Sequence, residues 1–265
     1  MDFGITGKRA LILSAGGGLG SAIALALARE GVQVYLADRN GQALSAAKDR
    51  IEKDLGDSTL VKGTFVWDLA KQTEWHSGTQ SVLESSGGID ILVNNTGGPP
   101  PGPAFGHDSQ VWRDAFDSMV VSAIGITDML LPGMRERKWG RVITSTSSGV
   151  ISPIPNLGLS NATRISLVGW SKTLARDVAK DRVTVNVVVP GRISTARIQF
   201  LDTAKAQREG RDAASVELES AASIPLGRYG RPEEYAEVVA FIASERASYV
   251  TGSSIRVDGG LIGNV

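Results

Sequence analysis

The chain has 265 residues, of which 42 % are hydrophobic, and this is enough apolar material for one fully packed α/β domain. Its 28 basic residues balance its 28 acidic residues, which argues against nucleic acid or an anionic membrane surface as a partner. It has no cysteine and only two histidines, so disulfides and thiolate metal sites are excluded and a multi-histidine metal site is disfavoured. No segment resembles a signal peptide or an apolar membrane span, so we expect a cytoplasmic protein without a membrane partner.

Short apolar runs alternate with longer helical patterns along most of the chain. Strands are predicted at 9–14, 32–37, 59–66, 89–94, 140–146, 183–189 and 254–257. Helices are predicted at 18–30, 40–54, 71–85, 109–137, 159–180 and 232–244. Several strand runs are apolar without strict alternation, as in parallel strands that are covered on both faces. We therefore predict a single α/β domain over residues 1–265, a Rossmann-type doubly wound parallel sheet of about seven strands with helices on both faces.

Segment 195–230 interrupts this alternation. It is polar and helical in pattern, and it stands between the sixth strand and the last helix. An insertion at this point overhangs the carboxyl ends of the strands, where such sheets bind ligands. We predict a substrate lid here, with a surface helix pair or a subunit contact as the alternatives.

A glycine-rich loop follows the first predicted strand and opens the first predicted helix. Glycines let a backbone approach a diphosphate closely, and a helix N-terminus supplies free N–H groups and a positive dipole. Turns also need glycine, but the position between a strand and a helix favours dinucleotide binding. The loop residues expected to bind the cofactor are Ser14, Gly16, Gly18, Leu19 and Gly20.

The second predicted strand ends at Asp38-Arg39, about twenty residues after the loop. A carboxylate at this place accepts hydrogen bonds from the ribose diol of NAD, whereas an arginine pairs with the 2′-phosphate of NADP. Asp38 should repel that phosphate unless Arg39 shields it, so we expect NAD as cofactor in preference to NADP. Alternatively, Asp38 only caps the next helix.

Together with further motifs, the sequence resembles the short-chain dehydrogenases/reductases, of the type often labelled 3-oxoacyl-(acyl-carrier-protein) reductase. The motifs are the glycine loop, Asp68-Leu69, Asn94-Asn95-Thr96-Gly97, Gly140-Arg141-Val142, VNVVVPGRIST (185–195) and VTGSSIRVDGG (250–260). The resemblance covers nearly the whole chain. It implies adenine contacts from Asp68 and Leu69, and adenosine-ribose contacts from Asn94 and Gly97. It also implies that the nicotinamide carboxamide is held by Pro190, Gly191, Ile193 and Thr195.

The same resemblance implies four catalytic positions, which in the family hold a serine, a tyrosine, a lysine and an asparagine. Aligned without gaps, the serine position falls on Ser147, the tyrosine position on Ser160 and the lysine position on Arg164. The asparagine position falls on Met119. Three of the four usual residues are thus absent in this alignment, and Arg164 would take over the lysine's contact with the nicotinamide ribose.

Physical chemistry limits what these replacements can do. Arginine keeps the positive charge of a lysine but does not shuttle protons, because its pKa lies above about 12. A water held between Ser147, Ser160 and Arg164 could donate the proton, with the guanidinium stabilising the developing alkoxide. The alternative is that Ser160 is only a helix N-cap and that Arg164 pairs with solvent or a neighbouring acid.

We therefore expect an NAD(P)-dependent oxidoreductase with an altered proton relay, acting on a small-molecule carbonyl or alcohol of the 3-oxoacyl or small-ketone type. A non-redox enzyme, such as an isomerase or dehydratase, and a non-catalytic dinucleotide-binding sensor are the alternatives on the same fold. The resemblance also implies a homo-oligomer, a tetramer or a dimer, formed through the helices at 109–137 and 159–180 and the last strand.

Overall fold

The computed structural model describes residues 2–264, and its strands form one seven-stranded sheet in the order β3-β2-β1-β4-β5-β6-β7. All neighbouring strands in it are parallel. The strands are β1 (Arg9–Leu13), β2 (Gln33–Asp38), β3 (Val61–Val66), β4 (Ile91–Asn95), β5 (Gly140–Ser145), β6 (Val183–Pro190) and β7 (Ser254–Val257). Each predicted apolar run overlaps one of these strands, and the predicted Rossmann-type sheet is confirmed.

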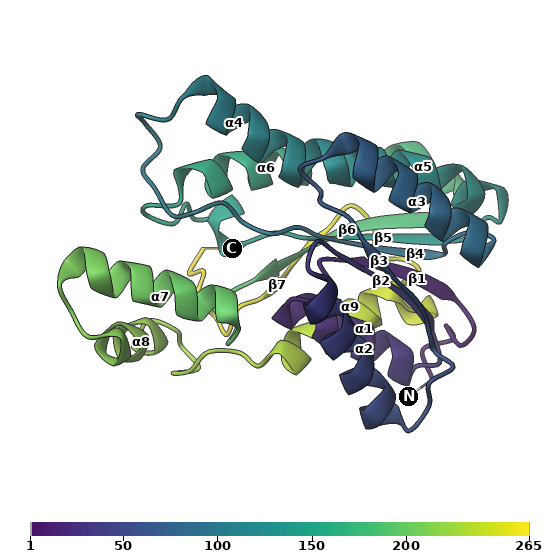
Figure 1. Ribbon diagram of the computed structural model, residues 1–265, viewed down its shortest axis with the longest axis horizontal. Helices are drawn as coiled ribbons and strands as arrows, with labels where there is room; N and C mark the ends of the chain where they lie inside the picture. The colour runs from purple at the N-terminus through teal and green to yellow at the C-terminus, as the bar shows by residue number, and fades with distance from the viewer. Residues whose placement is uncertain (1, 265) are drawn as a thin grey trace.

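Helices cover both faces of the sheet (Figure 1). One face carries α1 (Gly18–Arg29), α2 (Gly41–Leu55) and α9 (Pro232–Ala243). The other carries α3 (Gln72–Ser86), α5 (Ser122–Glu136) and α6 (Gly158–Val178). Short helical turns lie at η2 (Ser148–Val150), η3 (Ala179–Asp181) and η4 (Glu245–Ala247).

Alternate residues of the central strands belong to different hydrophobic cores. In β1, Ala10 and Ile12 pack with α1 and α9, whereas Leu11 and Leu13 pack on the opposite face with α3 and α5. Because successive side chains of a strand point to opposite faces, a strand covered on both sides must be apolar throughout. This burial explains the continuous apolar runs from which the strands were predicted.

The predicted helix at 109–137 is composed of three parts. α4 (Ser109–Phe116) and α5 are joined by a π-helical turn, η1 (Asp117–Val121). Within the residues described, the combined run Ser109–Glu136 is the one helix long and apolar enough to cross a membrane. That test is weak evidence for a membrane span, since α5 buries Ile126, Leu130 and Met134 in the core between this helix and the sheet.

The segment predicted as a lid folds into two helices, α7 (Ala196–Glu209) and α8 (Ala213–Ala222). Gly210 turns the chain between them with a left-handed φ of 62°, a conformation that glycine adopts without strain. Lys205 of α7 pairs with Glu219 of α8 at 3.0 Å. In Figure 1 the two green helices project beyond the carboxyl end of β6, beside the loop that precedes α4.

Buried ion pairs hold the opposite, amino-terminal edge of the sheet. Asp90, which precedes β4 and is 4 % exposed, accepts hydrogen bonds from Arg9 Nε at 2.9 Å and from Arg137 Nε at 3.0 Å. Burial alone would raise the pKa of Asp90, but the hydrogen bonds and positive charge of Arg9, with that of Arg137, outweigh it and lower the pKa. The carboxylate thus links β1, β4 and the end of α5.

Replacing Asp90 with asparagine should lower the free energy of unfolding by about 2 kcal/mol, because it leaves two partly buried guanidiniums without their anion. Urea unfolding at neutral pH measures this loss. Since the folded pKa is depressed, the stabilisation is present above the unfolded pKa of about 4 and is lost as the pH falls through the folded pKa. The difference in free energy of unfolding between wild type and Asp90→Asn should therefore shrink as the pH falls below about 4.

Asp54→Asn is the matched control, because Asp54 pairs with Arg50 at 3.9 Å between two exposed side chains. We expect it to change stability by less than about 0.5 kcal/mol. Equal losses in the two variants would contradict the role assigned to Asp90.

Candidate active site

A cavity of about 600 Å³ opens at the carboxyl ends of β1, β4, β5 and β6. Parallel strands end at the same edge, so the residues that follow them converge there. The wall includes Ser14 after β1, Thr96 and Gly97 after β4, and Ser147 after β5. The residues after β6 and the inner face of α7 complete it, through Pro190, Gly191, Arg192, Ile193, Thr195, Arg197, Ile198, Leu201 and Lys205.

The glycine loop forms one end of this cavity and is closely packed. A Cβ on Gly20 would lie 2.2 Å from the carbonyl oxygen of Ser14, and one on Gly18 would lie 2.9 Å from Thr195 Cγ2. α1 begins at Gly18 with Gly17 as its N-cap, and no side chain in the described part of the chain caps it. Its first N–H groups are therefore available to a phosphate.

The predicted cofactor residues divide into two groups. Those that line the cavity are Ser14, Gly18, Leu19, Gly97, Arg164, Pro190, Gly191, Ile193 and Thr195. Gly16 and Gly20 are not on the cavity wall, and Gly16 N donates to Asp38 Oδ2 at 3.1 Å. The structure thus brings together the residues predicted for the phosphates and the nicotinamide, whereas these two glycines are closely packed within the loop.

Two of the residues predicted for the adenosine, Arg39 and Asp68, line a separate, more open hollow at the carboxyl ends of β2 and β3. Asp38 stands between this hollow and the glycine loop, where its carboxylate also accepts from Asn40 N at 3.0 Å. The N-cap of α2 is Asn40, so Asp38 is not the cap of that helix. Leu69 is half-buried against the core of the α3 face, and its predicted contact with adenine stays a prediction.

The structure corrects the predicted position of Asn94. This side chain is 1 % exposed, and its Nδ2 donates to Thr127 Oγ1 of α5 at 3.1 Å. It points into the core, and its neighbour Asn95 takes the place at the cavity wall. The alternation of a strand explains the difference, because adjacent residues face opposite sides.

The three predicted catalytic residues, Ser147, Ser160 and Arg164, line the same cavity. Ser147 is the N-cap of η2, and its Oγ accepts from Gly149 N at 3.2 Å. α6 begins at Gly158 with Leu157 as its N-cap, so Ser160 lies inside the first turn and is not a helix cap. The alternative interpretation of Ser160 as an N-cap is therefore wrong.

The guanidinium of Arg164 is buried among backbone carbonyls. Its Nη2 donates to the oxygens of Thr96 at 3.1 Å and Gly97 at 2.9 Å, and its Nη1 donates to that of Ser145 at 3.4 Å. Burial, with the nearby charge of Arg197, lowers the pKa of Arg164 to about 10. No carboxylate in residues 2–264 contributes to its environment, so the structure does not support the alternative of a pairing with a neighbouring acid.

Met119 lies in η1 at 3 % exposure and faces α6. The hydroxyl of Thr163 is near its sulfur at 3.5 Å and donates to Leu159 O at 2.8 Å. A thioether is only a weak hydrogen-bond acceptor, so this side of the site offers no relay for protons.

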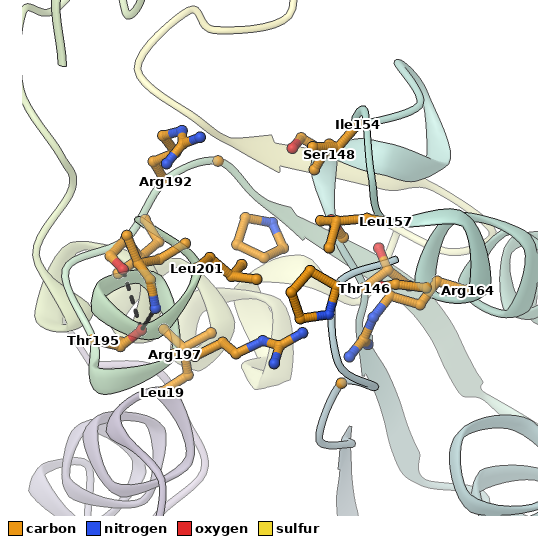
Figure 2. A pocket seen from close by; sticks show the side chains of 18 of the residues that line it. Leu19, Thr146, Ser148, Ile154, Leu157, Arg164, Arg192, Thr195, Arg197 and Leu201 are labelled. Carbon is orange, nitrogen blue, oxygen red and sulfur yellow. Dashed lines mark hydrogen bonds between the residues drawn. The ribbon is translucent and has the colours of Figure 1, made fainter. Parts of the chain in front are cut away.

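Three further residues contribute to the site and were not found by sequence reasoning. Thr146 is 5 % exposed at the cavity wall, and its Oγ1 has no hydrogen-bond partner among the described residues. Tyr235 of α9 is fully buried and donates to Ser145 Oγ at 2.8 Å. Arg197, in the first turn of α7, reaches from the side of Thr195 toward Arg164 (Figure 2). A polar residue directly after an apolar strand is a usable signal for Thr146, but no pattern marks the other two.

The arrangement is that of a dinucleotide site next to a small cavity with hydroxyls and one buried cation. A family model described as Enoyl-(Acyl carrier protein) reductase matches residues 14–262. The 3-oxoacyl-(acyl-carrier-protein) reductase FabG of Vibrio cholerae is 33 % identical over 260 residues, which cover 97 % of this chain and 98 % of that protein. Dehydrogenase/reductase SDR family member 4 of Bos taurus is 31 % identical over 259 residues, which cover 97 % of this chain and 88 % of that protein.

Among solved structures, L-sorbose reductase from Gluconobacter frateurii, complexed with NADPH and L-sorbose, superposes with a TM-score of 0.92. It is 32 % identical, and the match covers 100 % of both chains. Sequence and fold agree over nearly the whole length. The chain belongs to the short-chain dehydrogenase/reductase family of NAD(P)-dependent oxidoreductases.

Proposed function

We propose that this protein transfers a hydride between a nicotinamide dinucleotide and a carbonyl or alcohol substrate through an altered proton relay. The 3-oxoacyl compounds and small ketones are the proposed substrate class. The observation that carries the proposal is the convergence of Ser147, Ser160 and the buried guanidinium of Arg164 on one cavity beside the glycine loop.

The residues present fit a dinucleotide. The close contacts of Gly18 and Gly20 leave no space for a Cβ and let the backbone approach a diphosphate. Pro190, Gly191 and Thr195 would hold the nicotinamide end at the carboxyl end of β6. A bound dinucleotide supplies the hydride. The protein has to stabilise the negative charge on the substrate oxygen and provide its proton.

That oxygen gains negative charge during reduction and must be stabilised and protonated. Arg164 retains its charge at neutral pH, because its pKa is lowered only to about 10. A fixed cation in a site shielded from water stabilises an oxyanion strongly. The hydroxyls of Ser147 and Ser160, which line the cavity, can donate hydrogen bonds to the same oxygen.

The proton then has to come from the cavity itself. Serine hydroxyls are weak acids, and the Met119 side of the site is closed by a thioether. A water molecule held by Ser147, Ser160 and Arg164 would donate it, and solvent would replace that proton through the cavity mouth. The inner face of α7 borders this route, which supports the proposed role of residues 195–230 as a lid.

Exposed apolar side chains support the proposed homo-oligomer. Val111 and Phe116 of α4, Val121 of η1 and Ile165 of α6 are 41 %, 42 %, 40 % and 52 % exposed. They belong to the helices that the resemblance implies for subunit contacts. A second copy of the chain would remove this surface from water.

The proposal is tested with purified protein, NADH or NADPH, and a panel of 3-oxoacyl thioesters, 3-oxo esters and small ketones. We expect oxidation of at least one reduced nucleotide to depend on a carbonyl compound. Arg164→Met should lower kcat about a hundredfold or more, because it removes the charge that stabilises the oxyanion. Ser160→Ala should lower kcat less, since Ser147 still donates a hydrogen bond.

Arg176→Met is the matched control, since Arg176 lies exposed on the same helix, and it should leave kcat unchanged. Arg164→Lys retains a cation at this position, so comparing it with Arg164→Met separates loss of the charge from a folding defect. Unchanged turnover in Arg164→Met would contradict the proposed relay. Tight nucleotide binding without turnover on any carbonyl would instead favour the non-catalytic sensor.

We also propose that Asp38 favours NAD over NADP. Its carboxylate lies behind the glycine loop at the edge of the adenosine hollow, where it would repel a 2′-phosphate. Asp38→Asn removes the charge and keeps one of the two oxygens that accept from Gly16 N and Asn40 N. We expect the ratio of the NADPH and NADH dissociation constants to shift about tenfold or more toward NADPH.

Fluorescence titration with each reduced nucleotide measures this ratio. Asp54→Asn, an equal charge change at the far end of α2, should leave it unchanged. An unchanged ratio in Asp38→Asn, together with loss of NADPH binding in Arg39→Ala, would show that Arg39 selects the cofactor.

A further inference from the structure

Two arginines hold the first residues of the loop that follows β4. Arg164 of α6 donates to the carbonyls of Thr96 and Gly97, at 3.1 and 2.9 Å. Arg197 of α7 donates from Nη2 to the carbonyl of Pro99 at 2.6 Å. Both line the cavity, and Figure 2 shows them reaching toward each other from opposite walls.

These two cations differ from the other basic side chains of the cavity wall. Arg192 is neutralised by Asp202 at 2.7 Å, Lys205 by Glu219 at 3.0 Å, and Arg208 by Glu209 at 3.0 Å. For Arg164 and Arg197, no carboxylate of residues 2–264 contributes to the local electrostatics. Within residues 2–264 their hydrogen bonds go to neutral oxygens, which are backbone carbonyls and the hydroxyl of Thr96.

The two guanidiniums therefore repel each other in a region shielded from water. Burial lowers the pKa of Arg197, and burial together with the charge of Arg197 lowers the pKa of Arg164. Like charges at low dielectric raise the free energy of the unliganded protein. An anion between them would remove this repulsion, and arginine is well suited to bind carboxylate or phosphate oxygens with two hydrogen bonds.

The place of Arg197 shows where this anion would lie. Thr195, the N-cap of α7, packs on Gly18, since a Cβ there would meet its Cγ2 at 2.9 Å. The first turns of α1 and α7 are therefore adjacent at the glycine loop. From that point the Arg197 side chain crosses to Gly98, where a Cβ would lie 2.9 Å from its Nη2. Its guanidinium thus lies between the phosphate end of the cavity and Arg164.

We propose that Arg164 and Arg197 together form a binding site for one oxyanion group, a phosphate or a carboxylate. The group is carried either by the diphosphate of the dinucleotide or by a carbonyl substrate that bears a carboxylate. Because Arg197 also ties α7 to the loop after β4, the bound anion would strengthen the link between the lid segment and the sheet. The substrate form of this inference rests on the proposed reductase function, whereas the cofactor form does not.

The experiment compares Arg197→Met and Arg197→Lys with wild type in three measurements. The first is the dissociation constant of NADH at several salt concentrations, the second is competition of inorganic diphosphate with NADH, and neither needs turnover. The third is the KM of acetoacetate against that of methyl acetoacetate. Arg113→Met, which removes an exposed arginine of α4, is the control for a loss of charge and should match wild type throughout.

If the diphosphate of the cofactor fills the site, Arg197→Met should weaken NADH and diphosphate binding about tenfold or more, as expected for a lost charge-assisted hydrogen bond. The affinity of Arg197→Met for NADH should also depend less steeply on salt concentration than that of wild type, a change that a packing defect would not cause. Arg197→Lys should recover part of the affinity. If a substrate carboxylate fills it, the KM of acetoacetate should rise about tenfold while that of methyl acetoacetate stays constant. The proposal is overturned if all of these quantities in Arg197→Met remain within about twofold of wild type.

Absence of turnover would remove the third measurement and count against the proposed function alone. The first two would still decide the cofactor form of the inference, because nucleotide binding tests the site without chemistry. A folding defect would be recognised in Arg197→Met by its melting temperature, and Arg197→Lys would then carry the comparison.

Discussion

The site depends on the burial of one positive charge at the carboxyl edge of the sheet. The guanidinium of Arg164 is enclosed, and the oxygens of Thr96, Gly97 and Ser145 replace the water it has lost. A buried cation without such acceptors would be strongly unfavourable. The position of α6, the path of the loop after β4 and the end of β5 must therefore be correct together, and they define the wall on which Ser147 and Ser160 lie.

Charged side chains at the two ends of the strands differ in whether they are paired. At the amino-terminal edge, Asp90 precedes β4 and Asp181 precedes β6, and each carboxylate is paired with two basic side chains. At the carboxyl edge, Arg164 and Arg197 face the cavity without an acid among the described residues. The paired carboxylates link elements of the fold, and the two cations without an acid are the groups for which an anion is proposed.

The sequence allowed the layers of the fold to be predicted, because strands such as β1 are buried on both faces and carry an unbroken apolar run. It also allowed Ser147, Ser160 and Arg164 to be placed on one cavity, since the register of a strand and the following helix carries them there. It did not separate Asn94 from Asn95, because which of two adjacent residues faces the core depends on the neighbouring helix. Arg197 was not predicted because its contact with Pro99 joins segments 98 residues apart.

The proposed relay replaces a proton donor with a permanent charge. Arg164 remains protonated through the neutral range, since its pKa is about 10, so it can stabilise an alkoxide by its charge. The hydroxyls around it can orient a water but are too weakly acidic to act alone. With Met119 and Thr163 closing the inner side, both substrate and proton must enter by the mouth beside α7. In the proposed mechanism, the position of α7 would therefore control access to the reacting oxygen as well as to the cofactor.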